Sequence, residues 1–95
     1  MYARVVRFTD VTPERIAEIV NRIEETGGPP PGVESTGVEL FFDENQRTAV
    51  FVGYFETEEK LRSSSAVLEQ MDASDVPGTR ASADVCEIKV QRRTG

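Results

Sequence analysis

The chain has 95 residues, a length that suits one domain with one hydrophobic core. Its 17 acidic and 11 basic side chains give a formal net charge of −6, which disfavours binding to nucleic acid or to anionic lipid. The sequence contains no histidine, so it lacks the commonest metal ligand and the side chain best suited to proton transfer near neutral pH.

Two further features concern the compartment. Cys86 is the only cysteine, so no disulfide can form within the chain, as expected in a reducing cytosol. The longest unbroken apolar run, residues 49–52, is far too short to span a bilayer, and the first residues show no apolar signal segment. We therefore expect a cytoplasmic protein that binds neither membranes nor nucleic acid.

The first part of the chain predicts a strand, a helix and a stiff connection. Residues 2–8 are rich in β-forming side chains and predict the first strand. Thr12 is a suitable N-cap and Pro13 suits the first helical position; apolar residues then recur at spacings of three and four, which predicts a helix that ends at Gly27. Residues 27–32 are glycine and proline only, so they form a connector.

A hairpin follows the connector. Residues 34–42 and 47–55 alternate in ways that predict two strands, and the polar residues 43–46 between them predict a short reversal. Thr57 is the expected N-cap of a second helix. This helix contains three consecutive serines, residues 63–65, which could leave room for a ligand above the sheet or face solvent, and we favour solvent.

The last part of the chain predicts a loop and a fourth strand. The loop covers residues 72–78, where Asp72 and Asp75 lack the dense oxygen ligands of a calcium site. The fourth strand is expected over residues 82–90. Within it, Cys86 has no cationic cluster nearby in sequence that would activate it as a nucleophile, so we expect a small buried apolar side chain.

Strand, helix, hairpin, helix and strand give the βαββαβ order of the ferredoxin-like α+β fold. The predicted architecture is a four-stranded antiparallel sheet in which the first and third strands are central and both helices cover one face. Residues 1–95 are expected to form this single domain.

The element order, the length and the segment from Gly53 to Leu61, GYFETEEKL, resemble the dimeric α+β barrel superfamily, especially the antibiotic-biosynthesis-monooxygenase-like domains. The segment runs from an aromatic strand into a capped acidic helix, and the resemblance covers nearly the whole chain. It implies a homodimer and an activity similar to that of cofactor-independent oxygenases acting on polycyclic aromatic substrates. Haem-degrading members use an axial histidine that no residue here can match, so we expect no haem, no other cofactor and no metal.

Three side chains are candidates for ligand binding, and no catalytic residue is assigned. Tyr54, on the predicted third strand, could place its hydroxyl in a pocket between sheet and helices, or serve as core or interface packing. Arg4 and Arg7 fall on opposite parities of the first strand, so at least one should face a covered surface. Such an arginine needs an anionic partner, either a ligand or a carboxylate such as Glu39 or Glu87.

These features lead to one leading functional hypothesis and two alternatives. The leading hypothesis is a homodimer that binds a small apolar or aromatic ligand, or that acts as a cofactor-independent monooxygenase. The first alternative is an RNA-binding βαββαβ domain, because Arg47, Phe51 and Tyr54 occupy offsets typical of basic and base-stacking residues on a third strand. The second alternative is an amino-acid-sensing module of the same topology.

The third strand also predicts how a dimer would form. One of its parities carries Ala49, Phe51 and Phe55, and the other carries Val50, Val52 and Tyr54. Both parities are largely apolar, whereas a sheet with one covered face should alternate apolar with polar side chains. Two helices can cover only one face, so we expect a second copy to cover the other; which parity faces the helices is open.

Overall fold

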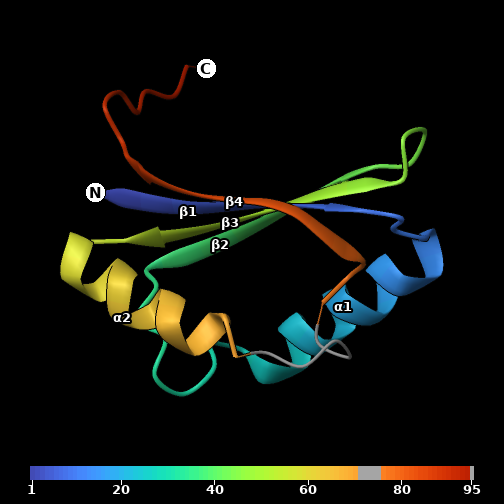
Figure 1. The fold of residues 1–95 in the computed structure, drawn as a ribbon, viewed down its shortest axis with the longest axis horizontal. Coiled ribbons are helices and arrows are strands. Elements are labelled where there is room, and N and C mark those ends of the chain that lie inside the picture. The colour runs from blue at the N-terminus through green and yellow to red at the C-terminus, as the bar shows by residue number, and fades with distance from the viewer. Residues whose placement is uncertain (71–75, 95) are drawn as a thin grey trace.

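Four strands and two helices follow one another in the order β-α-β-β-α-β (Figure 1). The computed structural model describes residues 1–70 and 76–94. The elements are β1 (Tyr2–Thr9), α1 (Pro13–Thr26), β2 (Gly37–Asp43), β3 (Thr48–Phe55), α2 (Glu58–Leu68) and β4 (Thr79–Glu87). This order confirms the predicted α+β fold class, a ferredoxin-like arrangement.

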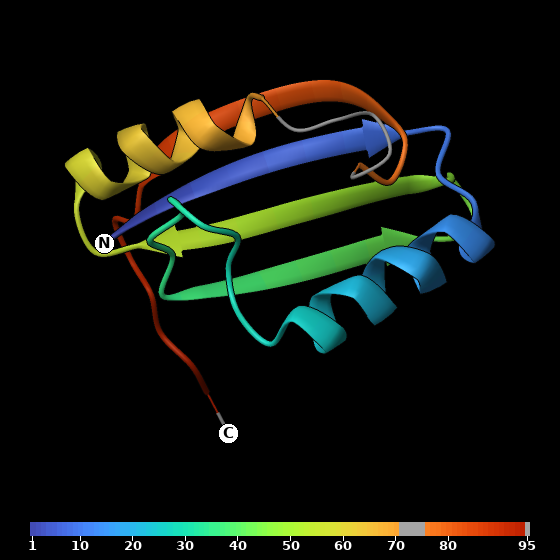
Figure 2. The ribbon, with the colours of Figure 1, turned by 90° about the horizontal axis from the view of Figure 1, so that it is seen from below.

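The four strands form one antiparallel sheet in the order β2-β3-β1-β4, so the first and third strands are central, as predicted. Both helices lie on the same face of this sheet (Figure 1). Seen from the helical side, α2 runs along the β1 and β4 half and α1 runs along the β2 edge (Figure 2). Among the described residues, no helix lies on the opposite face (Figure 1).

Both helices begin at the residues that the sequence indicates. The Thr12 hydroxyl accepts the backbone N–H of Arg15 at 3.1 Å, and Pro13 follows at the first helical position. Gly27 ends α1 with a φ of 69°, a left-handed conformation that favours glycine. The Thr57 hydroxyl caps α2 in the same way, accepting the N–H of Lys60 at 3.1 Å.

The core lies between the helices and one face of the sheet, in two clusters of buried side chains. The first cluster consists of Val6, Phe8, Val11 and Ala49, with Ile16, Leu40, Phe42, Phe51 and Val76 packed against it. The second consists of Val33, Phe55 and Leu61, with Tyr2 and Leu68 packed against it. The parity of β3 that carries Ala49, Phe51 and Phe55 therefore faces the helices. No helix among the described residues is long and apolar enough to cross a membrane.

The last strand, β4, begins and ends three residues earlier than predicted, because it extends only as far as its partner β1. Thr79 pairs with Thr9 at one end of β1, and Glu87 pairs with Tyr2 at the other. Just beyond the paired strands, the carbonyl of Met1, which precedes β1, accepts the N–H of Ile88 at 3.0 Å. The prediction had followed apolar alternation toward Val90, which is 83% exposed.

Two other predictions about single residues are wrong. Cys86 is exposed, not buried, because it lies on an edge strand and on the face that no helix covers. Ser64 is fully buried, and its hydroxyl accepts the N–H of Glu34 at 2.9 Å, so it fastens the connector to α2 rather than facing solvent. The predicted loop with Asp72 and Asp75 lies largely outside the described residues.

Gly78 occupies a crowded position that the sequence does not reveal. A Cβ added there would overlap the carbonyl oxygen of Thr9 and lie 2.9 Å from a methyl carbon of Val11, so the backbone would have to move. We expect Gly78→Ala to lower the free energy of unfolding by about 1–3 kcal/mol, as overpacking does elsewhere. Gly28→Ala is the matched control, because a Cβ there meets nothing within 4 Å. Urea denaturation of both variants tests this; equal stabilities would contradict the crowding.

Candidate functional site

The sheet face turned away from the helices, which we call the open face, is defined by the strand register. Val5 of β1 pairs with Val52 of β3, and the neighbouring Val6 pairs with Phe51 in the core. Side chains alternate along a strand, so Val5 and Val52 face outward. By the same register the open face carries Ala3 and Arg7 of β1, Glu39, Phe41 and Asp43 of β2, Val50 and Tyr54 of β3, and Ser82, Asp84 and Cys86 of β4.

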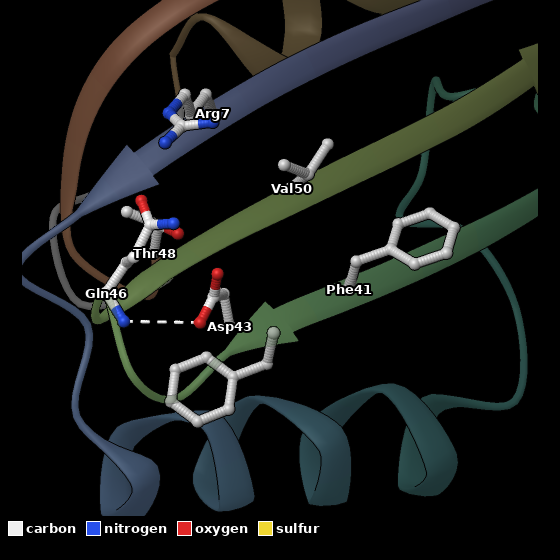
Figure 3. Close-up of a pocket in the computed structure, with 7 residues that line it drawn as sticks. Arg7, Phe41, Asp43, Gln46, Thr48 and Val50 are labelled. Atoms are coloured by element: carbon white, nitrogen blue, oxygen red, sulfur yellow. Dashed lines mark hydrogen bonds between the residues drawn. The ribbon is translucent and has the colours of Figure 1, made fainter.

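A hollow of about 260 Å³ lies at the end of the open face where β2 turns into β3 (Figure 3). We call it the hairpin hollow. Arg7, Val50 and Phe41 line it side by side, because Arg7 pairs with Val50 and Val50 pairs with Phe41 across three adjacent strands. Phe41 is 52% exposed. The remaining lining residues are Phe42, Asp43, Gln46 and Thr48.

The hairpin hollow contains one cationic and one anionic side chain. The guanidinium of Arg7 is exposed and makes no ion pair or hydrogen bond with the described part of the chain. One carboxylate oxygen of Asp43, Oδ1, accepts the backbone N–H of Gln46 at 3.2 Å and so holds the turn. The other carboxylate oxygen of Asp43 has no donor among the described residues. A ligand could therefore reach both charged groups.

Tyr54 lies on the open face, not in a pocket between sheet and helices. Its hydroxyl donates to Oε1 of Glu39 on β2 at 2.6 Å, and its ring lies beside Gly37. The hydrogen bond to Glu39 raises the pKa of Tyr54 above its ordinary value of 10.0, and burial and the negative charge of Glu39 act in the same direction. The tyrosine is therefore a neutral donor that is already engaged within the sheet.

Arg4 faces the helices and is held by a carboxylate. Its side chain is only 11% exposed, and its guanidinium lies 3.1 Å from Oε1 of Glu69, the residue that caps α2. The other oxygen of Glu69 binds Arg80 of β4 at 2.8 Å. The prediction of an ion pair for one of the two arginines is confirmed, but the predicted partners are wrong. Glu69 thus fastens the end of α2 to two strands, to β1 through Arg4 and to β4 through Arg80.

The two carboxylates predicted for Arg4 or Arg7 bind elsewhere. Glu39 lies on the open face and accepts the Tyr54 hydroxyl. Glu87 pairs with Lys89 at 2.8 Å, two residues along the chain. Of the three candidate ligand-binding residues, Arg7 lines the hairpin hollow, whereas Tyr54 and Arg4 line neither that hollow nor the one between α1 and β2.

A smaller hollow of about 180 Å³ lies between α1 and β2, where a pocket between helices and sheet was expected. Val20, Ile23, Val38 and Leu40 line it together with Glu24. Its lining contains no hydroxyl, thiol or cationic group. It can bury apolar atoms, but it offers little to orient a polar ligand or to act on one.

The placement of Phe51 bears on the RNA-binding alternative. Phe51 packs into the core and cannot stack on a base that approaches the open face. On the open face the strands themselves place three carboxylates, Glu39, Asp43 and Asp84, and one guanidinium, Arg7, a balance that opposes binding of phosphates. Among the described residues no group of three or more His, Cys, Asp or Glu side chains could hold a metal ion.

Comparisons with protein-family models, with curated proteins and with solved structures each gave no match. The ferredoxin-like fold therefore rests on the element order and strand pairing of this chain. Membership of the dimeric α+β barrel superfamily stays a prediction.

Sequence reasoning missed Phe41 and Asp43 as members of the site. The sequence does show that Phe41 and Asp43 belong together. They are two residues apart, and side chains two apart on a strand lie on the same face, here the open face of β2. Their meeting with Arg7 depends on the register of β1 against β3, which no local pattern reveals.

The ion pairs of Glu69 predict a pH-dependent contribution to stability. Hydrogen bonds from Arg80 and then from Arg4 hold the pKa of Glu69 below its ordinary value of 4.5, although partial desolvation opposes them. Because this pKa is lowered in the folded state, the stabilisation is present at neutral pH and is lost as the pH falls through the lowered pKa.

We therefore expect Glu69→Gln to lower the thermal unfolding midpoint at pH 7, with the difference from the unsubstituted protein shrinking near pH 3. Thermal scans by circular dichroism at both pH values test this. Glu44→Gln, an exposed residue of the β2–β3 turn, is the matched control. A Glu69→Gln deficit that is as large near pH 3 as at pH 7 would show that the ion pairs are not its cause.

Proposed function

We propose that this domain binds a small aromatic molecule in the hairpin hollow and does so as a homodimer whose open faces meet. The observation that carries the proposal is the meeting of Arg7, Phe41 and Val50 in one hollow on an uncovered sheet face. Small-molecule sites combine an apolar lining with a few polar groups that fix orientation, and this hollow has both.

The size of the hollow restricts the ligand. A cavity of about 150 Å³ holds a benzene molecule, whereas sites for drug-sized ligands occupy about 300–1,000 Å³. At about 260 Å³ the hairpin hollow suits one aromatic ring with a short polar group. A polycyclic substrate, of the kind that the family resemblance implies, would extend beyond this hollow, which is open to the outside.

The proposal concerns binding and not turnover. Arg7, Gln46 and Thr48 supply donors that can orient a ligand. The hydroxyl of Thr48 makes no hydrogen bond to Asp43, so the lining contains no nucleophile held by a base.

A second copy is the proposed cover for the open face. Val5, Val50 and Val52 form a half-buried apolar strip along its two central strands, next to the exposed ring of Phe41. A soluble chain seldom leaves such a strip against water, and two-fold pairing is the commonest way to cover it. In such a pair, the hairpin hollow, which is open to the outside in one copy, would be closed by the other.

We expect benzyl alcohol, an uncharged ring with one hydroxyl, to bind in the hairpin hollow. Titration at millimolar concentration should give saturable NMR shifts at the backbone amides of Thr48 and Val50. Phe41→Ala removes the ring that the ligand contacts and should weaken binding at least about tenfold, since burying a phenyl side chain contributes about 1.5–3 kcal/mol.

Val85→Ala is the matched control, because Val85 is 58% exposed on the edge strand β4 and lies on the other parity of the sheet. It should leave the affinity unchanged. Saturable shifts that gather at Val20 and Val38 instead would move the site to the hollow beside α1 and contradict the proposal, as would the absence of any saturable shift.

A further inference from the structure

The strand register fixes the separation between Arg7 and Asp43, the two charged residues of the hairpin hollow. Arg7 pairs with Val50 and Asp43 pairs with Thr48, so their backbones lie two strands across and two residues along the sheet. Those spacings correspond to about 10 Å and about 7 Å. The two side chains flank Thr48 and Val50 without touching each other (Figure 3).

We infer that the hairpin hollow selects a zwitterion, namely an α-amino acid with an aromatic side chain, an inference that rests on the proposed binding function. The carboxylate of the amino acid would bind the guanidinium of Arg7, and its ammonium group would bind the free oxygen of Asp43. Each charge of the hollow then has an opposite charge of the ligand as its partner.

The two charges of the hollow should give zwitterions a higher affinity than simple acids or amines. An aromatic acid is attracted by Arg7 but repelled by Asp43, and an aromatic amine meets the reverse. Even in water, an opposite charge 4 Å away contributes about fivefold to affinity, and a like charge removes as much. A zwitterion is attracted by both Arg7 and Asp43, so it should bind more tightly than either singly charged analogue.

The apolar lining of the hollow favours an amino acid with an aromatic side chain. Thr48 and the methyl groups of Val50 lie between the two charged groups, and the ring of Phe41 lies beside Val50 on β2 (Figure 3). Aromatic rings pack against such a surface in offset or edge-to-face arrangements. The amide of Gln46 and the hydroxyl of Thr48 are additional partners for the polar end.

The test compares L-phenylalanine with 3-phenylpropionate, which lacks the ammonium group, and 2-phenylethylamine, which lacks the carboxylate. We expect L-phenylalanine to bind at least fivefold more tightly than either analogue in NMR titrations. Asp43→Asn keeps an oxygen for the N–H of Gln46 and so preserves the turn. This variant should reverse the preference toward 3-phenylpropionate, and Arg7→Gln should reverse it toward 2-phenylethylamine.

A matched control is Arg62→Gln, which removes a guanidinium on the exposed side of α2 that pairs with Glu58; the three affinities should not change. Binding of 3-phenylpropionate as tight as that of L-phenylalanine would overturn the zwitterion inference and leave the proposed aromatic site intact. Shifts with benzyl alcohol but with none of the three charged probes would do the same. If benzyl alcohol also fails, the proposed function falls as well.

Discussion

The pairing of β1 with β3 and β4 determines which side chains of this small domain are buried under the helices and which lie on the opposite face. In that register Val6 lies beside Phe51 under the helices, while Val5 lies beside Val52 on the opposite face. A slip of one residue would exchange the two sets, so the hydrophobic core and the open face are consequences of the same hydrogen-bond ladder. The location of Arg7 beside Val50 follows from it too.

The helices make use of only one of the two apolar faces that this register creates. Leu61 and Phe55 are almost completely buried where α2 packs, and Glu69 fastens the end of that helix to β1 and β4. On the other face the charged and aromatic side chains gather near the β2–β3 turn, and one of the charges, Arg7, has no partner in the described part of the chain. This contrast between a fastened arginine and an unpaired one is the reason for placing the proposed binding site at Arg7 and not at Arg4.

Much of the fold could be predicted from local patterns. Capping at Thr12 and Thr57, the stop at Gly27 and the hairpin between β2 and β3 all depend on residues close together in sequence. The apolar character of both parities of β3 was also visible. These features were enough for the element order and for the expectation of an uncovered sheet face.

The rest depended on contacts between distant residues. Arg4 meets Glu69 across 65 residues of sequence, so its partner could not be read from the first strand. β4 ends where β1 ends, at the pair of Glu87 with Tyr2, rather than where its own apolar alternation ends. The hairpin hollow joins Arg7 to Phe41 through β3, and only the register of three strands reveals it.

The central claim, that the open face is the surface by which this chain associates with a second copy, is tested most directly by sedimentation of Val52→Asp. Val52 points outward from a central strand, so a carboxylate there should oppose association without entering the core. We expect a dimer for the unsubstituted protein and for Val85→Asp at micromolar concentration. For Val52→Asp we expect a folded monomer with an unchanged far-ultraviolet circular dichroism spectrum. A stable, folded monomer of the unsubstituted protein at the same concentration would contradict the claim.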